Sequence, residues 1–297
     1  MATMTAIELR RGTQEDLPES YDVFYENEVA GDPNPPPHGE VSSCLRHVFA
    51  TGEPYLAERG GRIVGFAALI TRGPVAYLTD LFVRRAEQSG GVGGALLRRI
   101  LPADERIRCT MSSRDPRALA LYVRAGMRPQ WPNLWLRAST ARLGALPRGG
   151  VEVVEARAGD AELVGWDAAA SGRHRPAEHQ YWRGEGAIPV WFERGGARVG
   201  YGYVQTRSPG SLWSPDAITV GPIGALTPAD ARECVCAAVE FARARAEVVR
   251  LSVPGPHPSL AALLDAGFQI TYVETFVSTA ATPFLDPERY VGSGDFF

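Results

Sequence analysis

Short stretches in which apolar and polar residues alternate recur along the first half of the chain, and this period of two is typical of half-buried β-strands. Between them, apolar residues return every three or four positions, which predicts amphipathic helices. Thr13 and Asp16 have the spacing of a capping box at a helix start, and residues 32–38 form a proline-rich loop. The predicted strands cover 7–11, 54–59, 62–71, 75–83, 105–111 and a stretch ending near 138, and the helices follow Thr13 and cover 40–51, 91–101 and 116–125.

The same pattern returns in the second half of the chain, which indicates an internal repeat. Glu58–Phe66 reappears as Glu193–Tyr201, each with a Gly-Gly turn between two strands, and the Ala-Gly pair at 125–126 reappears at 266–267. The fold class that we expect is therefore α/β (α+β), with two tandem domains, each a mixed, largely antiparallel sheet flanked by helices. The expected parts are a domain at 1–140, a Gly- and Pro-rich linker at 141–150 and a second domain at 151–297.

Length and charge exclude several classes of protein. A chain of 297 residues with 45% apolar and 22% charged residues is long enough for two globular cores and is unlike a disordered chain. The net charge is −3, so no basic field favours nucleic acid or a membrane surface, and the apolar runs are far shorter than the roughly 18 residues that span a bilayer. The N-terminus lacks the apolar segment of a signal peptide, so we expect a cytoplasmic protein.

Cysteine and lysine usage excludes further chemistry. The four cysteines lack zinc-ligand spacing, so we expect no metal and interpret them as free thiols in a reducing compartment. All 31 basic residues are arginine, which excludes a Schiff-base lysine and the lysine of a P-loop.

The stretch from Leu81 to Leu97 carries the main chemical signal. It reads as an apolar strand, a glycine-rich loop and an amphipathic helix. This order points several unpaired backbone N–H groups at one place beside the positive end of a helix dipole, where an anion can bind. A glycine-rich turn without a ligand is the alternative. A dinucleotide-binding motif fits poorly, because Leu96 stands where its third glycine is needed.

Two segments in this half resemble one known family. Gln88–Gly93 reads Q-x-x-G-x-G and resembles the acetyl-CoA signature (R/Q)-x-x-G-x-(G/A) of the GNAT N-acetyltransferase superfamily. Ala118–Pro129 resembles the A-x-x-L-Y-x-x-x-G-F segment of the same family, in the same order along the chain. The resemblance covers residues 6–139 well and 151–279 in outline. Ser89 and Asp115 depart from the family pattern, which often has Gly and Asn there.

The resemblance implies a binding site for acetyl-CoA as acyl donor. The strand residues Leu81 and Val83 would pair through their backbone with the pantetheine arm, and an N–H near Leu81 would polarise the acetyl carbonyl. Asp115 would contact the same arm. The full set of cofactor-binding residues that we expect is Leu81, Phe82, Val83, Gln88, Ser89, Gly90, Gly91, Val92, Gly93, Gly94 and Asp115, with the glycine-loop amides on the pyrophosphate.

The resemblance also implies catalytic and acceptor residues. Tyr122 would protonate the departing CoA thiolate, although a core tyrosine is the alternative. Asp80 would act as a base or anchor for the amine, or would make a purely structural bond. Glu26, Glu28 and His38 flank the loop that would shape the acceptor pocket, and the alternative for each is a solvated surface group.

The second repeat is expected to be degenerate. Aligning Ile218–Val220 with Leu81–Val83 places Pro228 and Asp230 within the phosphate loop, where a missing N–H and a negative charge oppose a pyrophosphate. Thr227, Pro228 and Asp230 instead predict an ordinary helix start with its own cap. Aligning the glycines at 126 and 267 replaces Tyr122 by Leu263. The aromatic tail at 284–297 either returns to the first domain or packs locally.

These observations predict an acetyl-CoA-dependent N-acetyltransferase that acts on a primary amine of a small molecule in a ternary complex. The alternatives are a longer acyl-CoA donor and an inactive acyl-CoA- or metabolite-binding module. We expect neither nucleic acid nor a membrane as partner. A monomer, in which the repeat replaces a dimer, is favoured over a homodimer.

Overall fold

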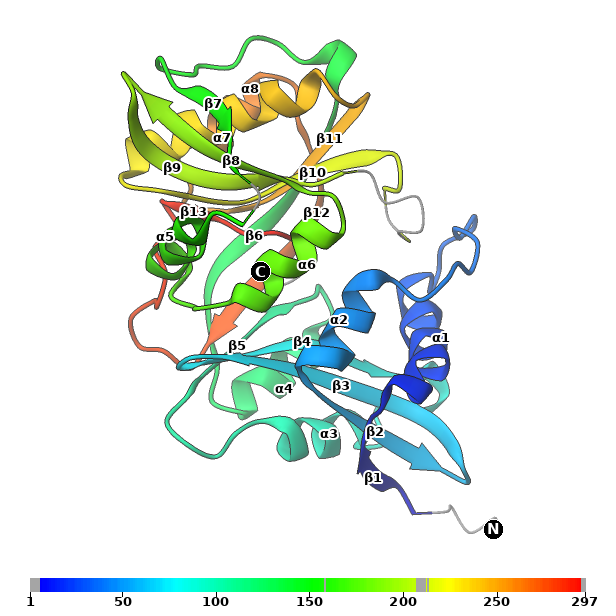
Figure 1. Ribbon diagram of the computed structural model, residues 1–297. Coiled ribbons are helices and arrows are strands. Elements are labelled where there is room, and N and C mark those ends of the chain that lie inside the picture. Colours follow the sequence, from blue (N-terminus) through cyan, green and yellow to red (C-terminus); the bar gives the residue numbers. More distant parts are fainter. Residues whose placement is uncertain (1–5, 158, 207–211, 213, 295–297) are drawn as a thin grey trace. The chain divides into compact units, whose positions relative to one another are not determined.

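The computed structural model describes residues 6–157, 159–206, 212 and 214–294 (Figure 1). These residues form two compact units. Unit 1 contains residues 6–110, 124–126 and 212, and unit 2 contains 111–123 and the described residues from 127 onward, apart from 212. Each unit is a mixed α/β structure with a largely antiparallel sheet, so the expected fold class is confirmed.

The sheet of unit 1 follows the chain. Its first four strands pair as antiparallel neighbours in sequence order, and β5 runs parallel to the last of them. Helices α1 and α2 cover one face of this sheet, and α3 lies on the other (Figure 1). The elements are β1 (Glu8–Arg11), η1 (Gln14–Asp16), α1 (Leu17–Glu28), α2 (Ser43–Thr51), β2 (Glu53–Arg59), β3 (Arg62–Arg72), β4 (Val75–Val83), η2 (Arg85–Glu87), α3 (Val92–Ile100) and β5 (Ile107–Ser112), whose last two residues belong to unit 2.

Local sequence signals explain where these elements begin. The backbone N–H of Thr13 donates to Asp16 Oδ2 at 2.8 Å, as a capping box requires, and a short 3-10 turn then leads into α1. Ser42 caps α2 by accepting the Leu45 N–H at 3.2 Å. The hairpin between β2 and β3 turns at Gly60 and Gly61, which both have positive φ.

Unit 2 holds the remaining elements. Its sheet has the strand order β7-β8-β9-β10-β11-β6-β12, in which β10 and β11 are parallel, and β13 is a further partner of β10. The elements are α4 (Pro116–Arg124), whose last residue falls in unit 1, β6 (Arg128–Ser139), η3 (Thr140–Arg142), β7 (Glu152–Glu155), α5 (Ala161–Ser171), α6 (Pro176–Gly184), β8 (Ile188–Arg194), β9 (Ala197–Val204), β10 (Ala217–Ala225), α7 (Pro228–Arg243), β11 (Val248–Pro254), α8 (Leu260–Asp265), β12 (Gln269–Ser278) and β13 (Tyr290–Val291).

Strand β6 lies between two strands of the second repeat. Leu136 pairs with Leu251 of β11 on one side and with Ile270 of β12 on the other, and its side chain is fully buried in the core of unit 2. The segment that follows the first repeat's last helix therefore completes the sheet of unit 2. The compact units do not coincide with the expected repeats, and the repeat boundaries remain a prediction.

Strand pairing corrects the alignment of the two repeats. Val83 pairs with Gly65 in unit 1, and Ala225 pairs with Gly200 at the same place after the Gly-Gly turn in unit 2. The N–H of residue 84 donates to Val64 O, and the N–H of residue 226 donates to Val199 O in the same way. Leu81 therefore corresponds to Ile223, and the sequence alignment on Ile218–Val220 was wrong by five positions.

The corrected register changes the reason for the degeneracy of the second repeat. Residues 84–91 separate β4 from α3, whereas Leu226 and Thr227 alone separate β10 from α7. The second repeat has not exchanged the residues of the glycine loop; it lacks the loop.

The C-terminal segment adds a strand to the second repeat. Val291 pairs with Ile223 and Tyr290 pairs with Gly224, on the edge of β10 that faces away from β9. Ile223 and Gly224 correspond to Leu81 and Phe82 of unit 1. The tail thus occupies the strand edge that matches the expected pantetheine-binding edge of the first repeat.

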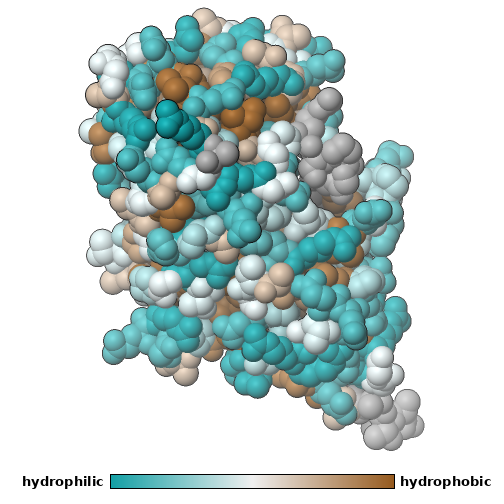
Figure 2. Space-filling model, viewed as in Figure 1, coloured by the Kyte–Doolittle hydropathy of each residue, from teal (hydrophilic) through white to brown (hydrophobic). Residues whose placement is uncertain are grey.

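Figure 2 shows hydrophilic side chains over most of the visible face, with apolar residues scattered among them. In the described ranges, no helix is both long and apolar enough to cross a membrane. The cysteines are free thiols, and Cys109, Cys234 and Cys236 are buried.

Candidate functional site

Strand β4 has an open edge in unit 1. It pairs with β3 along its whole length, from Val75 to Val83. Its pairing with β5 in the described structure covers Val75 to Tyr77, and a β-bulge at Thr79 follows. Beyond the bulge, the edge of β4 that faces away from β3 is available to an added strand.

Alternation along β4 identifies the backbone groups that point to this edge. The N–H of Arg84 donates to Val64 O of β3 at 2.8 Å, so the neighbouring Val83 directs its N–H and C=O the opposite way, and Leu81 does the same. These are the two residues expected to pair with pantetheine. Phe82 points its carbonyl toward β3, and its ring packs against Phe24 with a centroid separation of 5.1 Å.

The chain turns from this strand into a glycine loop. Ser89 and Gly91 have left-handed backbone conformations, with φ of 64° and 87°. Gly91 is exposed and immediately precedes α3, so the N–H groups of Val92, Gly93 and Gly94 are free of intrahelical partners. A left-handed glycine, free amides and the positive end of the α3 dipole fit a pyrophosphate.

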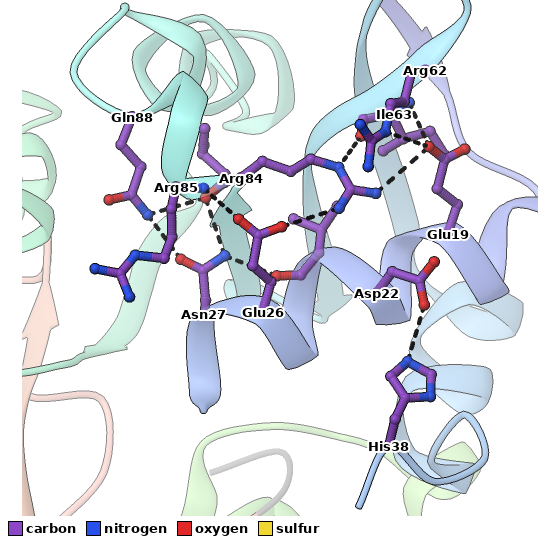
Figure 3. Close-up of polar contacts among 12 residues, drawn as sticks. Glu19, Asp22, Glu26, Asn27, His38, Arg62, Ile63, Arg84, Arg85 and Gln88 are labelled. Carbon is purple, nitrogen blue, oxygen red and sulfur yellow. Dashed lines mark hydrogen bonds and ion pairs between the residues drawn. The ribbon is translucent and has the colours of Figure 1, made fainter. Parts of the chain in front are cut away.

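Helix α1 holds the entrance to the loop (Figure 3). Asn27 Nδ2 donates to Val83 O at 3.0 Å, and Gln88 Nε2 donates to Asn27 Oδ1 at 2.8 Å and to Val83 O at 3.1 Å. Sequence reasoning missed Asn27, because its importance depends on a contact between α1 and a strand end far along the chain.

Glu26 makes structural contacts at the same turn. Its carboxylate accepts the Arg85 backbone N–H at 2.8 Å and the Arg84 guanidinium at 3.1 Å, while Arg84 Nε donates to Ile63 O at 2.8 Å (Figure 3). These contacts anchor the start of the loop to α1. The expected role of Glu26 in acceptor binding therefore has no support from its contacts and stays a prediction.

Asp80 lies half-buried just after the bulge. Burial raises the pKa of its carboxyl to about 6, the hydrogen bond from Thr79 opposes this shift, and the negative charge of Glu28 adds to it. Near neutral pH such a carboxyl exchanges protons readily, which suits a general base. Of the expected acceptor residues, Glu28 is therefore linked electrostatically to Asp80.

His38 belongs to a more exposed cluster. Its Nε2 lies 3.0 Å from Asp22 Oδ1, and its ring contacts the edge of Tyr25 with centroids 4.7 Å apart. The Tyr25 hydroxyl donates to Pro36 O at 2.7 Å, so α1 holds the proline-rich loop in place. The aromatic and ionic contacts explain the position of His38, and its acceptor role stays a prediction.

Two expected site residues lie in unit 2. Tyr122 is buried on α4, where its carbonyl accepts the Met127 N–H at 3.1 Å. Asp115 precedes α4 and is paired with Arg117 at 2.7 Å, and the Arg117 hydrogen bonds lower the pKa of Asp115 below its ordinary value. Unit 1 brings together the β4 edge, Asp80, Glu28 and the glycine loop; the placement of Tyr122 and Asp115 beside them remains a prediction.

The second repeat satisfies its corresponding helix start with its own side chains. Thr227 Oγ1 accepts the Asp230 N–H at 3.1 Å, and Arg194 Nη1 pairs with Asp230 at 2.6 Å. This is the capped helix start that the sequence predicts from Thr227, Pro228 and Asp230. Leu263, aligned with Tyr122, is fully buried in the core.

A buried polar network in unit 2 includes Tyr290 of β13. Arg175 forms two hydrogen bonds with Asp167, at 2.6 and 2.7 Å, and also donates to the Tyr290 hydroxyl. Burial opposes ionisation of Asp167, but the charge and hydrogen bonds of Arg175 outweigh it and lower the pKa of Asp167 below its usual range. The network thus connects the tail to α5 and α6.

No group of three or more His, Cys, Asp or Glu side chains in the described ranges is arranged to hold a metal ion.

Comparison with known proteins agrees with these features. Residues 14–127 match the sequence profile of the "Acetyltransferase (GNAT) family". A search of curated proteins found no match.

Solved structures resemble the whole chain. A proposed acetyltransferase from Pyrococcus horikoshii is 17% identical, with 98% of this chain and 95% of that chain covered and a TM-score of 0.74. A tandem GNAT protein from the clavulanic acid biosynthesis pathway is 17% identical over 94% of this chain and 99% of its own, with a TM-score of 0.65. A GCN5-related N-acetyltransferase from Sphaerobacter thermophilus is 16% identical over 97% and 100%, with a TM-score of 0.61. At these identities the likeness is one of fold.

Proposed function

We propose that this protein transfers the acetyl group of acetyl-CoA to a primary amine at a single site in the first repeat, because residues 14–127 match the GNAT acetyltransferase family and the whole chain has the fold of a tandem GNAT protein. The observation that carries the proposal is the open edge of β4, which leads directly into the left-handed glycine turn and the N-terminus of α3. The first repeat has this combination, and the second repeat does not.

The backbone would bind and orient the donor. Acetyl-CoA supplies a thioester, whose carbonyl carbon is the electrophile. The Leu81 and Val83 backbone would pair with the pantetheine arm, and a backbone N–H near Leu81 would stabilise negative charge on the carbonyl oxygen. The amides of Val92, Gly93 and Gly94 would hold the pyrophosphate at the end of α3.

Two side chains would move protons. Asp80 would accept the proton that the ammonium group of the acceptor must lose before attack. As the amide C–N bond forms and the C–S bond breaks, the Tyr122 hydroxyl would donate a proton to the thiolate, and the second proton released by the attacking nitrogen would restore the Tyr122 hydroxyl. The basicity of Asp80 supports the first role, and the position of Tyr122 in the family motif supports the second.

The acceptor that we propose is a small molecule with a cationic amine. The negative charge of Glu28 raises the pKa of Asp80, and a positive charge on the acceptor would relieve the repulsion between the two carboxyl groups. The proline-rich loop, held on α1 through Tyr25, would form a rigid wall of the pocket.

Calorimetric titration with acetyl-CoA tests the proposal. We expect the wild-type chain to bind one acetyl-CoA, and Gly91→Asp to lose binding, because the new side chain adds a negative charge at the pyrophosphate amides and disfavours the left-handed turn. Gly73→Asp is the matched control, since Gly73 is also left-handed and equally open but lies at the opposite end of β4.

Other outcomes of this titration would contradict the proposal. Two sites per chain would mean that the second repeat binds the donor in spite of its missing loop. No binding to the wild-type chain would reject the transferase and leave a module that binds another metabolite.

A further inference from the structure

Three hydrogen bonds join Asn27, Gln88 and Val83 where α1 meets the glycine loop, and Figure 3 shows Asn27 and Gln88 side by side there. Asn27 donates to the carbonyls of both Val23, at 2.8 Å, and Val83, at 3.0 Å, and accepts from Gln88 at 2.8 Å. Gln88 also donates to Val83 O at 3.1 Å. We call these three residues the amide clamp.

The amide clamp limits what the open edge of β4 can bind. A carbonyl oxygen has two lone pairs, and Asn27 and Gln88 direct a donor to each lone pair of Val83 O. An added strand can therefore use the Leu81 N–H, the Leu81 C=O and the Val83 N–H, but the next carbonyl is already occupied. The clamp thus marks where strand-like pairing ends and the glycine loop begins.

The clamp also determines the path of the loop. Gln88 directly precedes Ser89 and the left-handed turn, so holding its side chain against Asn27 fixes where the chain turns toward α3. Glu26, on the same turn of α1, binds the Arg85 N–H and holds the other end of the connection. Both ends of this segment are therefore attached to one helix.

The amide clamp is present in the repeat that has the glycine loop and is missing from the repeat that lacks it. The second repeat keeps the same hairpin register, including the equivalent hydrogen bond from Leu226 N–H to Val199 O. It joins β10 to α7 through two residues and has no position that corresponds to the Gln88 side chain. A sheet-and-helix unit of this kind is thus built without the clamp, which points to a role in ligand binding.

We propose that Asn27 is a positioning residue for the acyl-CoA donor: it orients the end of β4 and the glycine loop so that pantetheine and pyrophosphate bind together. The inference rests on the proposed function.

Calorimetry with CoA on a double-mutant cycle tests this role. We expect Asn27→Ala and Gln88→Ala each to weaken CoA binding by about tenfold, the size of a lost hydrogen bond or two. The double variant should bind CoA with nearly the same affinity as each single variant, because the two side chains act as one clamp. Gln14→Ala, which removes a long side chain–backbone hydrogen bond elsewhere in unit 1, should leave the affinity unchanged.

Thermal unfolding of the same variants separates positioning from stability. If Asn27 serves only to stabilise unit 1, Asn27→Ala will melt at a lower temperature while its folded form binds CoA with wild-type affinity, and the inference fails. Full additivity in the cycle would also overturn it. Asn27→Asp keeps an acceptor for Gln88 but turns a carboxylate toward Val83 O, and should bind as weakly as Asn27→Ala. An absence of CoA binding to the wild-type chain would reject the proposed function instead.

Discussion

At the scale of single residues, neighbouring acidic side chains on α1 have different environments. Glu26 is neutralised by Arg84 and by a backbone N–H, and holds the loop. Glu28 acts on Asp80 as an unfavourable charge. Acids two residues apart on a helix point in different directions, so the sequence could not show which carboxyl group pairs with Arg84 and which raises the pKa of Asp80.

The basicity of Asp80 predicts a pH-dependent stability. Its pKa is about 6 in the folded chain and close to 3.8 in an unfolded one, so the native state binds the proton more tightly. The stabilising contribution is complete below about pH 4 and is lost as pH rises through 6. Relative to wild type, Asp80→Asn should therefore be more stable at pH 8 than at pH 4, and should lack an acetyl-transfer inflection near pH 6.

Denaturant unfolding at both pH values measures this difference. Asp32→Asn, which changes an exposed carboxyl group in the proline-rich loop, is the control. A stability difference between Asp80→Asn and wild type that is the same at pH 4 and pH 8 would show that burial does not perturb Asp80.

At the scale of elements, the two repeats differ in the pairing of one equivalent strand edge, which belongs to β4 in the first repeat and to β10 in the second. The β4 edge is left open beyond its bulge, whereas the equivalent edge of β10 is covered by β13. The tail thus provides in unit 2 the strand that a pantetheine arm would provide in unit 1. Unpaired strand edges cost stability or invite other chains, so a repeat without a ligand gains from closing its own edge.

The buried hydroxyl of Tyr290 makes this closure testable. Tyr290→Phe keeps the aromatic ring and the β13 backbone pairing but leaves an Arg175 N–H without this acceptor. We expect a loss of about 1–3 kcal/mol in the free energy of unfolding. A chain truncated after Thr279, which also loses β13, should lose more. Equal stability of all three proteins would mean that the tail is not part of the folded core.

At the scale of the whole molecule, β6 makes the second half of the chain dependent on the first. Leu136 and Ala138 contribute to the core of unit 2, and the buried Asn133 side chain donates to Ser252 of β11 and to Glu274 of β12. Without β6, the facing edges of β11 and β12 would have no partner between them. We therefore expect the second repeat not to fold without β6.

Two fragments check this dependence. The fragment 151–297, cut after the predicted linker, should show no cooperative thermal transition by circular dichroism. The fragment 127–297, which includes β6, should regain one, because it restores both strand pairings of Leu136. A cooperative transition in the shorter fragment would show that the second repeat folds as a separate domain.

The sequence by itself determined the features that depend on neighbouring residues. The Thr13–Asp16 capping box, the Gly60–Gly61 hairpin and the helix start at Thr227 all form as predicted, because each requires hydrogen bonds across a few residues. The glycine loop after β4 and the repeated order of elements were also readable, since both are recorded in local composition and period.

Only the tertiary structure decided the features that depend on pairing between distant segments. The hydrogen bonds of β9 set the register of β10 and revealed a missing loop where an ungapped alignment had indicated a mutated one. The insertion of β6 between β11 and β12, and the contact of Asn27 with Val83, likewise join residues far apart in the chain. Burial and the pairing of strand edges over the whole sheet determine such partners. A local sequence pattern contains no information about either.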